Sequence, residues 1–105
     1  MSHLTEYQHA ALQFRLPTYS PEAAVMGLLA ESGEVAGIFQ KLLRGDFDAD
    51  VAATKLHKEL GDVLWHVAAI AHDNGWHLDE IANSNIEKLT SRQLRNVIAG
   101  SGDDR

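Results

Sequence analysis

The chain contains 105 residues, of which 45% are hydrophobic and 23% charged, a composition typical of one ordered domain spanning residues 1–105. Its net charge of −6 argues against binding to nucleic acid, and no apolar run approaches the ~20 residues needed to span a membrane. The sequence has no cysteine and no basic, apolar leader at its N-terminus, and both features favour the cytoplasm.

The first predicted elements are two helices, one before Pro17 and one after Ser20. The opening helix is indicated by apolar residues at steps of three or four: Leu4, Tyr7, Ala11 and Phe14. Ser20 followed by Pro21 is typical of an N-cap and a first helical position. From Pro21 to Gly45, a natural helix stop, a second apolar stripe recurs at helical spacing: Val25, Leu28, Leu29, Ser32, Val35, Ala36, Phe39, Leu42 and Leu43.

Two more helices are predicted in the second half of the chain. One runs from about residue 51 to 72, where "DNG" stops it, and the other runs from about 78 to 93. No segment alternates apolar and polar residues as a half-buried strand would. The fold class is therefore predicted to be all-α, a four-helix-type bundle with a short N-terminal helix. The tail at about 100–105, "GSGDDR", is expected to be flexible or ordered by a ligand.

Two pairs of acidic residues lie within the long helices. Glu31 and Glu34 form the first pair and Glu59 and Asp62 the second, each at a spacing that places both carboxylates on one helix face. A short connector predicts that the two helices form an antiparallel hairpin. Counted from the turn, Glu34 and Glu59 lie about 15 Å and about 12 Å along their helices. All four carboxylates are therefore expected to converge.

Four convergent carboxylates would repel one another unless a cation lay between them. Each pair taken alone is more often solvated surface, but both pairs here flank apolar stripes at matching heights. Oxygen ligands favour a hard cation, Mg²⁺ or Mn²⁺, with Ca²⁺ less suited. The sequence thus predicts a magnesium site whose ligands are Glu31, Glu34, Glu59 and Asp62.

In these motifs the sequence resembles the MazG-like family of all-α nucleoside triphosphate pyrophosphohydrolases. The family hallmark, Glu-x-x-Glu followed by Glu-x-x-Asp, matches "ESGE" at 31–34 and "ELGD" at 59–62. The segment "NSNIEKLTSR" at 83–92 is similar to the family's Asn-x-x-Lys-Leu segment, and the tail at 100–105 is similar to the ending of a small single-domain subgroup. The resemblance covers most of the chain from about Tyr7.

The resemblance implies Mg²⁺-dependent hydrolysis of a (deoxy)nucleoside triphosphate to a nucleoside monophosphate and pyrophosphate. The four carboxylates would hold the metal, and Glu31 or Glu34 would accept the proton of the attacking water. Relatives of this type form dimers or tetramers, so a homodimer or homotetramer is expected. His77 stands where relatives tend to place a serine or similar cap before the last main helix, which leaves that helix boundary open.

Five further residues are candidate contacts to the nucleotide: Lys41, Trp65, Asn85, Lys88 and Arg92. Asn85 and Lys88 share a face of their helix, and Arg92 follows one turn later. Lys88 is assigned to phosphate mainly by the resemblance. Asn85 could equally be a boundary residue whose amide bonds to a neighbouring helix, and Arg92 could be a surface cation at a helix end.

Lys41 lies on the same helical face as Glu34, seven residues earlier, and is placed to reach a phosphate. Trp65 is suited to stacking on a nucleobase, although a tryptophan on a bundle helix is more often part of the core or of an interface.

Two other functions fit parts of the sequence. A di-iron carboxylate bundle needs Glu-x-x-His on two helices, and only Glu6 with His9 has that spacing. A non-catalytic acidic helical module that binds a protein partner would show neither metal dependence nor nucleotide turnover. We expect a visible iron chromophore only for the first and an inert protein only for the second.

Overall fold

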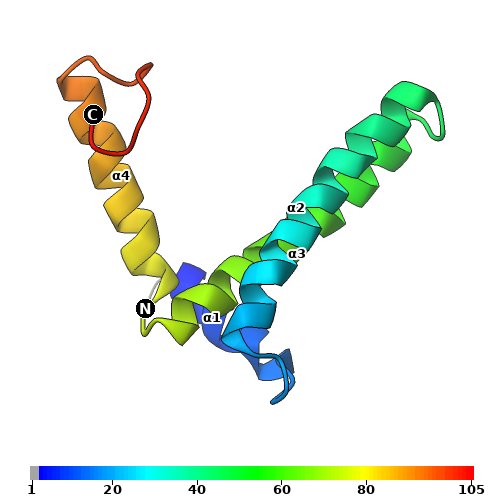
Figure 1. Ribbon diagram of the computed structural model, residues 1–105, viewed down its shortest axis with the longest axis horizontal. Helices are drawn as coiled ribbons and strands as arrows, with labels where there is room; N and C mark the ends of the chain where they lie inside the picture. The colour runs from blue at the N-terminus through cyan, green and yellow to red at the C-terminus, as the bar shows by residue number, and fades with distance from the viewer. Residues whose placement is uncertain (1–2) are drawn as a thin grey trace.

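The computed structural model describes residues 3–105, which form helices joined by short turns (Figure 1). The elements are α1 (His3–Ala11), a 3₁₀ turn (Leu12–Phe14), α2 (Pro21–Arg44), α3 (Ala49–Asp73) and α4 (Leu78–Leu94). No strand occurs among these residues. The all-α prediction with a short N-terminal helix is confirmed, and α3 begins two residues earlier than expected.

Local side chains set the ends of α2 and α3. The Ser20 hydroxyl accepts a hydrogen bond from the Ala23 amide at 3.1 Å, and Gly45 ends α2 with a φ of +84°, a conformation that glycine adopts without steric cost. The Asp48 carboxylate accepts from the Val51 amide at 2.9 Å and caps α3. Because the stop of α2 and the cap of α3 lie three residues apart, the two helices form a tight antiparallel hairpin (Figure 1).

The two helices of this hairpin meet along one row of residues on each, spaced three and four apart as in a coiled coil. The α2 row is buried or half-buried and comprises Ala24, Leu28, Glu31, Val35, Ile38 and Leu42. The α3 row comprises Ala52, Leu56, Glu59, Val63, His66 and Ile70. We call these two rows the hairpin seam. Both rows include a glutamate.

The apolar stripe predicted for α2 combined two neighbouring rows, and only one of them faces α3. The other row is exposed and comprises Val25, Leu29, Ala36, Phe39 and Leu43. We call it the outer row. These five residues of the predicted apolar stripe are therefore not part of the core, because periodicity alone does not choose between adjacent rows of one helix.

The start of α4 is capped by side chains of α1. His77 makes no capping hydrogen bond. Instead, the Gln8 side-chain oxygen accepts from the Leu78 amide at 3.0 Å, and the Thr5 hydroxyl donates to the Asp79 carboxylate at 2.7 Å. The missing serine-type cap is thus replaced by residues 70 or more positions away in the sequence.

Gln8 also connects α1 to α3 and to the turn that follows it. Its side-chain nitrogen donates to the carbonyls of Ala68 and Trp76, both at 3.1 Å, and the residue is only 1% exposed. Around it lies the buried apolar cluster of the molecule: Ala68, Ala71 and Leu78, with Tyr7 and Val67 packed against them. This junction is the point from which α4 departs.

Beyond its first turn α4 leaves the hairpin, so that the two form the arms of a V (Figure 1). The radius of gyration is 16.6 Å, against about 13 Å for a compact domain of this length. Large apolar side chains are consequently exposed along both arms. Within the described residues no helix combines the length and the hydropathy that crossing a membrane requires.

Candidate metal centre and nucleotide site

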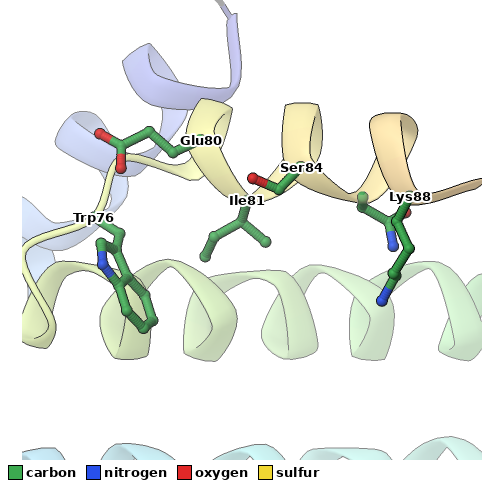
Figure 2. A pocket seen from close by; sticks show the side chains of 6 residues that line it. Trp76, Glu80, Ile81, Ser84 and Lys88 are labelled. Carbon is green, nitrogen blue, oxygen red and sulfur yellow. The ribbon is translucent and has the colours of Figure 1, made fainter. Parts of the chain in front are cut away.

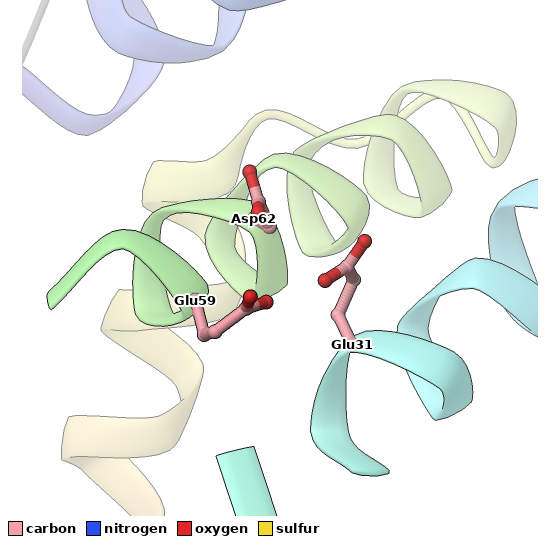
Figure 3. A group of neighbouring side chains, drawn as sticks. All are labelled: Glu31, Glu59 and Asp62. Carbon is pink, nitrogen blue, oxygen red and sulfur yellow. The ribbon is translucent and has the colours of Figure 1, made fainter. Parts of the chain in front are cut away.

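Three of the four predicted metal ligands lie together across the hairpin. Glu31 comes from α2, and Glu59 and Asp62 come from successive turns of α3 (Figure 3). One carboxylate oxygen from each lies within 4.8 Å of the others. Glu31 and Glu59 belong to the hairpin seam, which brings them face to face, and Asp62 stands exposed at its edge. We call these residues the carboxylate trio.

Crowding in the trio changes the proton affinity of Glu59. Its pKa is raised above the ordinary value, first because it shares a hydrogen bond with the Glu31 carboxyl. Burial and the charges of Glu31 and Asp62 act in the same direction, whereas the nearby Lys55 ammonium opposes them. One Glu59 oxygen, Oε2, is buried without any hydrogen-bond partner.

The trio fits a hard divalent cation. Its donors are all carboxylate oxygens, the ligand type that Mg²⁺ prefers. A buried oxygen without a partner is costly in a folded protein, and a cation would satisfy it. The same cation would relieve the charge repulsion from Glu31 and Asp62, which adds to the hydrogen bond with Glu31 and to burial in raising the pKa of Glu59.

Glu34 is exposed and lies outside the trio. A step of three residues turns the side chain by about 60° around the helix axis, which moves Glu34 off the seam that contains Glu31. The height argument placed Glu34 opposite Glu59, whereas the structure pairs Glu59 with Glu31, three residues and so nearly one turn away along α2. Counting residues from the turn fixed neither this offset nor the rotation of α2.

Asn85 and Lys88 line an open pocket on α4. The remaining lining residues are Trp76, Glu80, Ile81 and Ser84 (Figure 2). The pocket belongs to the α4 arm, whereas the carboxylate trio belongs to the hairpin arm, and the arms diverge (Figure 1). A single chain therefore presents the predicted phosphate contacts and the predicted metal ligands on separate arms.

The other predicted contacts lie in different surroundings. Lys41 is exposed on α2, ten residues from Glu31 and so about 15 Å farther along the helix. Trp65 is half-buried; its indole nitrogen donates to the Ala11 carbonyl at 3.0 Å, and its ring packs against Tyr19. Trp65 thus fastens α1 to α3, the structural role that is usual for tryptophan on such a helix. Arg92 is buried beneath the C-terminal tail.

Comparison with known proteins identifies the family. The model of the MazG nucleotide pyrophosphohydrolase domain matches residues 19–96. The chain belongs to the MazG family. The matched range contains α2, α3 and α4 of this MazG domain, with both acid pairs, and MazG proteins are typically metal-dependent.

One relative of this MazG domain is the "Gene 37 protein" of Mycobacterium phage L5. The two are 44% identical over 85 residues, which cover 76% of this chain and 72% of that protein. No solved structure gives a significant match. The relative's name describes no activity, so the family assignment rests on the domain match.

Two residues in or next to the α4 pocket were missed in the sequence. Trp76 is half exposed at one end of the pocket, and its position directly after Gly75, at a helix stop, was a signal that an aromatic side chain stands free of the helices. Asp103 contacts Lys88 and Arg92 from the tail. Its signal was an acidic pair in a segment otherwise made of glycine, serine and arginine.

Proposed function

We propose that this MazG domain hydrolyses (deoxy)nucleoside triphosphates between the α and β phosphates, giving a nucleoside monophosphate and pyrophosphate, with Mg²⁺ as cofactor and Mn²⁺ as a substitute. The observation that carries the proposal is the carboxylate trio across the hairpin, with a buried Glu59 oxygen that has no partner. The family match supplies the reaction class.

The proposed roles follow from where the carboxylates lie. Glu31, Glu59 and Asp62 would hold the metal, and Glu34 would join them from the next turn of α2, where its side chain is exposed. A Mg²⁺ ion held by these residues would supply positive charge to the phosphate chain and would make an attacking water more acidic. Either Glu31 or Glu34 accepts the proton of the attacking water.

The pocket of α4 supplies the proposed contacts to the rest of the nucleotide. Lys88 neutralises phosphate charge, and Asn85, exposed one turn earlier, offers both a donor and an acceptor to the sugar or base. The aromatic face that is open to a stacking base is that of Trp76, since Trp65 is packed inside the fold. Lys41 and Arg92 remain second candidates for the phosphate chain.

The proposal includes a second copy of the chain, in a homodimer or homotetramer. Two observations support it. The outer row of α2 repeats apolar residues at the spacing that helix pairs use for packing, yet it is exposed. The V shape also separates the α4 pocket from the trio within one chain, and a second copy seated in the opening would bring the two kinds of site together (Figure 1).

A panel of nucleoside triphosphates tests the proposed reaction. Each is incubated with the protein and Mg²⁺, and pyrophosphate, inorganic phosphate and the nucleotide products are measured separately. We expect pyrophosphate and monophosphate in equal amounts from at least one substrate, and none when EDTA is present. Inorganic phosphate together with a nucleoside diphosphate would assign the wrong bond, and a complete lack of turnover would favour the non-catalytic interaction module.

The di-iron alternative gains no support from the geometry. Glu6 and His9 are exposed on α1 and do not belong to the carboxylate trio. The trio contains no histidine, whereas di-iron bundles bind their metals through both carboxylates and histidines.

A further inference from the structure

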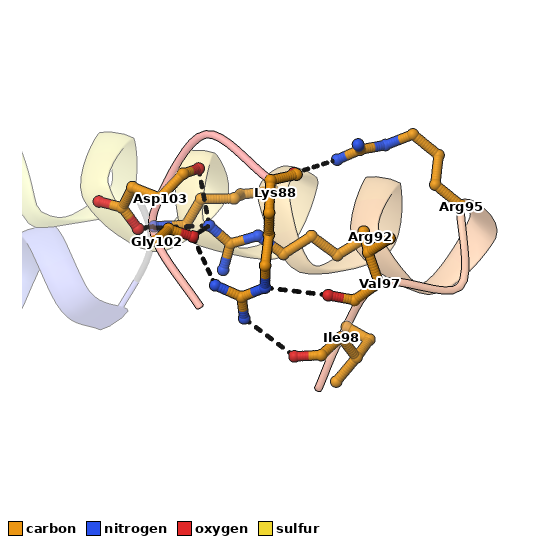
Figure 4. Close-up of polar contacts among 8 residues, drawn as sticks. Lys88, Arg92, Arg95, Val97, Ile98, Gly102 and Asp103 are labelled. Atoms are coloured by element: carbon orange, nitrogen blue, oxygen red, sulfur yellow. Dashed lines mark hydrogen bonds and ion pairs between the residues drawn. The ribbon is translucent and has the colours of Figure 1, made fainter. Parts of the chain in front are cut away.

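The C-terminal tail places a carboxylate on the cations of the proposed phosphate site. Asp103 Oδ1 lies 3.1 Å from Lys88 Nζ and 3.3 Å from Arg92 Nη2, so one oxygen bridges both cations (Figure 4). The Arg92 nitrogen also donates to the Asp103 carbonyl at 2.8 Å. A phosphate oxygen would seek the same two donors, because both carboxylate and phosphate accept charge-assisted hydrogen bonds.

The tail is fastened to the end of α4 independently of Asp103. The Arg105 guanidinium donates to the carbonyls of Val97, Ile98 and Gly102, and Arg95 donates to the Arg105 carbonyl at 2.7 Å (Figure 4). These bonds close residues 95–105 into a loop that returns to the helix. Releasing Asp103 therefore leaves the rest of the loop in place.

The contacts of Asp103 with Lys88 and Arg92 are of the kind that can break and re-form, and they are too weak to hold the fold together. Its side chain is 83% exposed and that of Lys88 is 38% exposed, and ion pairs this open to water are weak. The hydrogen bonds of Lys88 and Arg92 lower the pKa of the Asp103 carboxyl, so it is charged at neutral pH. Arg92 is 95% buried, and its Nε has no hydrogen-bond partner, which leaves a donor unsatisfied when Asp103 occupies the site.

We propose that Asp103 is an internal competitor of the substrate: its carboxylate occupies Lys88 and Arg92 in the free protein and must leave before the phosphate chain binds. The inference rests on the proposed function, because it takes Lys88 as a phosphate contact. A nucleoside triphosphate carries several negative charges, whereas the Asp103 side chain carries one. Replacement of Asp103 by the substrate on the two cations is therefore favoured. The tail thereby raises the substrate concentration that the protein requires.

The test compares Asp103→Asn with Asp104→Asn. Both substitutions remove one charge from adjacent exposed residues, but only Asp103 contacts the two cations. We expect Asp103→Asn to lower KM for a nucleoside triphosphate about two- to fivefold with kcat unchanged, in line with the strength of an exposed ion pair. Asp104→Asn should keep the parent KM. An unchanged or raised KM in Asp103→Asn overturns the inference.

Binding of inorganic tripolyphosphate, measured by calorimetry with Mg²⁺, separates this inference from the proposed reaction. Asp103→Asn should bind this probe more tightly than the parent by a similar factor, whether or not any nucleotide is hydrolysed. In a Lys88→Met background the same substitution should have a smaller effect, because one of the two competed cations is gone. Equal affinities of parent and Asp103→Asn refute the competition even if the protein proves to be a pyrophosphohydrolase.

Discussion

At the scale of single residues, the position of Glu59 is the feature with the clearest consequences. It lies in the hairpin seam, where apolar side chains pack, and faces the carboxyl of Glu31 with Asp62 nearby. A protein without a use for this arrangement would gain stability by replacing it, since like charges so close together oppose folding. We therefore expect that removing a charge from the trio stabilises the metal-free protein and weakens the proposed metal site.

We predict that Glu59→Gln melts at a higher temperature than the parent in EDTA at pH 8. The raised pKa of Glu59 means that the folded state binds its proton more tightly than the unfolded state. The charged Glu59 carboxylate therefore lowers the free energy of unfolding. This destabilisation is present in full above the folded-state pKa and disappears as the pH falls to the ordinary pKa of about 4.5. The parent should therefore gain stability on mild acidification, and the advantage of Glu59→Gln should shrink.

Glu34→Gln is the matched control for this prediction. It removes the same charge from an exposed residue of the neighbouring helix turn that lies outside the trio. Its melting temperature in EDTA should follow that of the parent at each pH. If both variants shift alike, the effect comes from net charge and the trio does not carry it.

At the scale of elements, the close approach of α2 and α3 depends on Gly27. A methyl group at this position would lie inside the van der Waals distance of His66 Nε2 and the Tyr19 hydroxyl, which hydrogen-bond to each other at 2.7 Å. We predict that Gly27→Ala destabilises the fold by about 1–3 kcal/mol, less a helix-propensity gain of up to ~1 kcal/mol. Chemical denaturation measures the difference.

Gly37→Ala is the control for that substitution, because a Cβ added at Gly37 meets no atom within 4 Å. It should stabilise the protein by about 0.5–1 kcal/mol through helix propensity alone. If Gly27→Ala were as stable as Gly37→Ala, the side chains of His66 and Tyr19 would not lie as close to Gly27 as described.

The orientation of α4 depends on Gln8. Replacing it with methionine keeps the volume but leaves the Leu78 amide and two carbonyls without their buried partner. We predict a loss of roughly 3 kcal/mol in unfolding free energy, because each buried polar group left unsatisfied costs about 1–3 kcal/mol. Gln13→Met removes only an exposed contact to His9 at 3.3 Å and should cost little; equal losses in both variants would contradict the capping role.

The elements show which parts of the structure were predictable from the sequence. The helices α1 to α4 were predictable, because apolar periodicity and local signals such as Ser20 and Gly45 act on residues within a turn or two. The rotation of α2 about its axis was not predictable, because its two apolar rows have the same period. Only the contact with α3 decides which row is buried. That choice also decided that Glu31, and not Glu34, faces Glu59. The cap of α4 was unpredictable for a similar reason, since it comes from Gln8 on a distant part of the chain.

At the scale of the whole molecule, the open V leaves the outer row of α2 without a partner. We predict that the protein elutes at a multiple of its 11.5 kDa chain mass in light scattering coupled to size exclusion. Leu29→Lys should shift the protein toward the monomer, since Leu29 is 77% exposed in the middle of the row. Gln40→Lys, a polar position outside the row, should not. A monomeric parent would contradict the proposed second copy.

The central claim is that the carboxylate trio is a magnesium site on which turnover depends. Calorimetric titration of Mg²⁺ into the parent, Glu59→Gln and Glu87→Gln, with pyrophosphate release measured on the same samples, tests it most directly. Glu87 is exposed on α4, so its variant should match the parent. We predict that Glu59→Gln binds Mg²⁺ at least about tenfold more weakly and loses about a hundredfold in turnover. Equal Mg²⁺ affinity and equal turnover in Glu59→Gln and the parent would contradict the account.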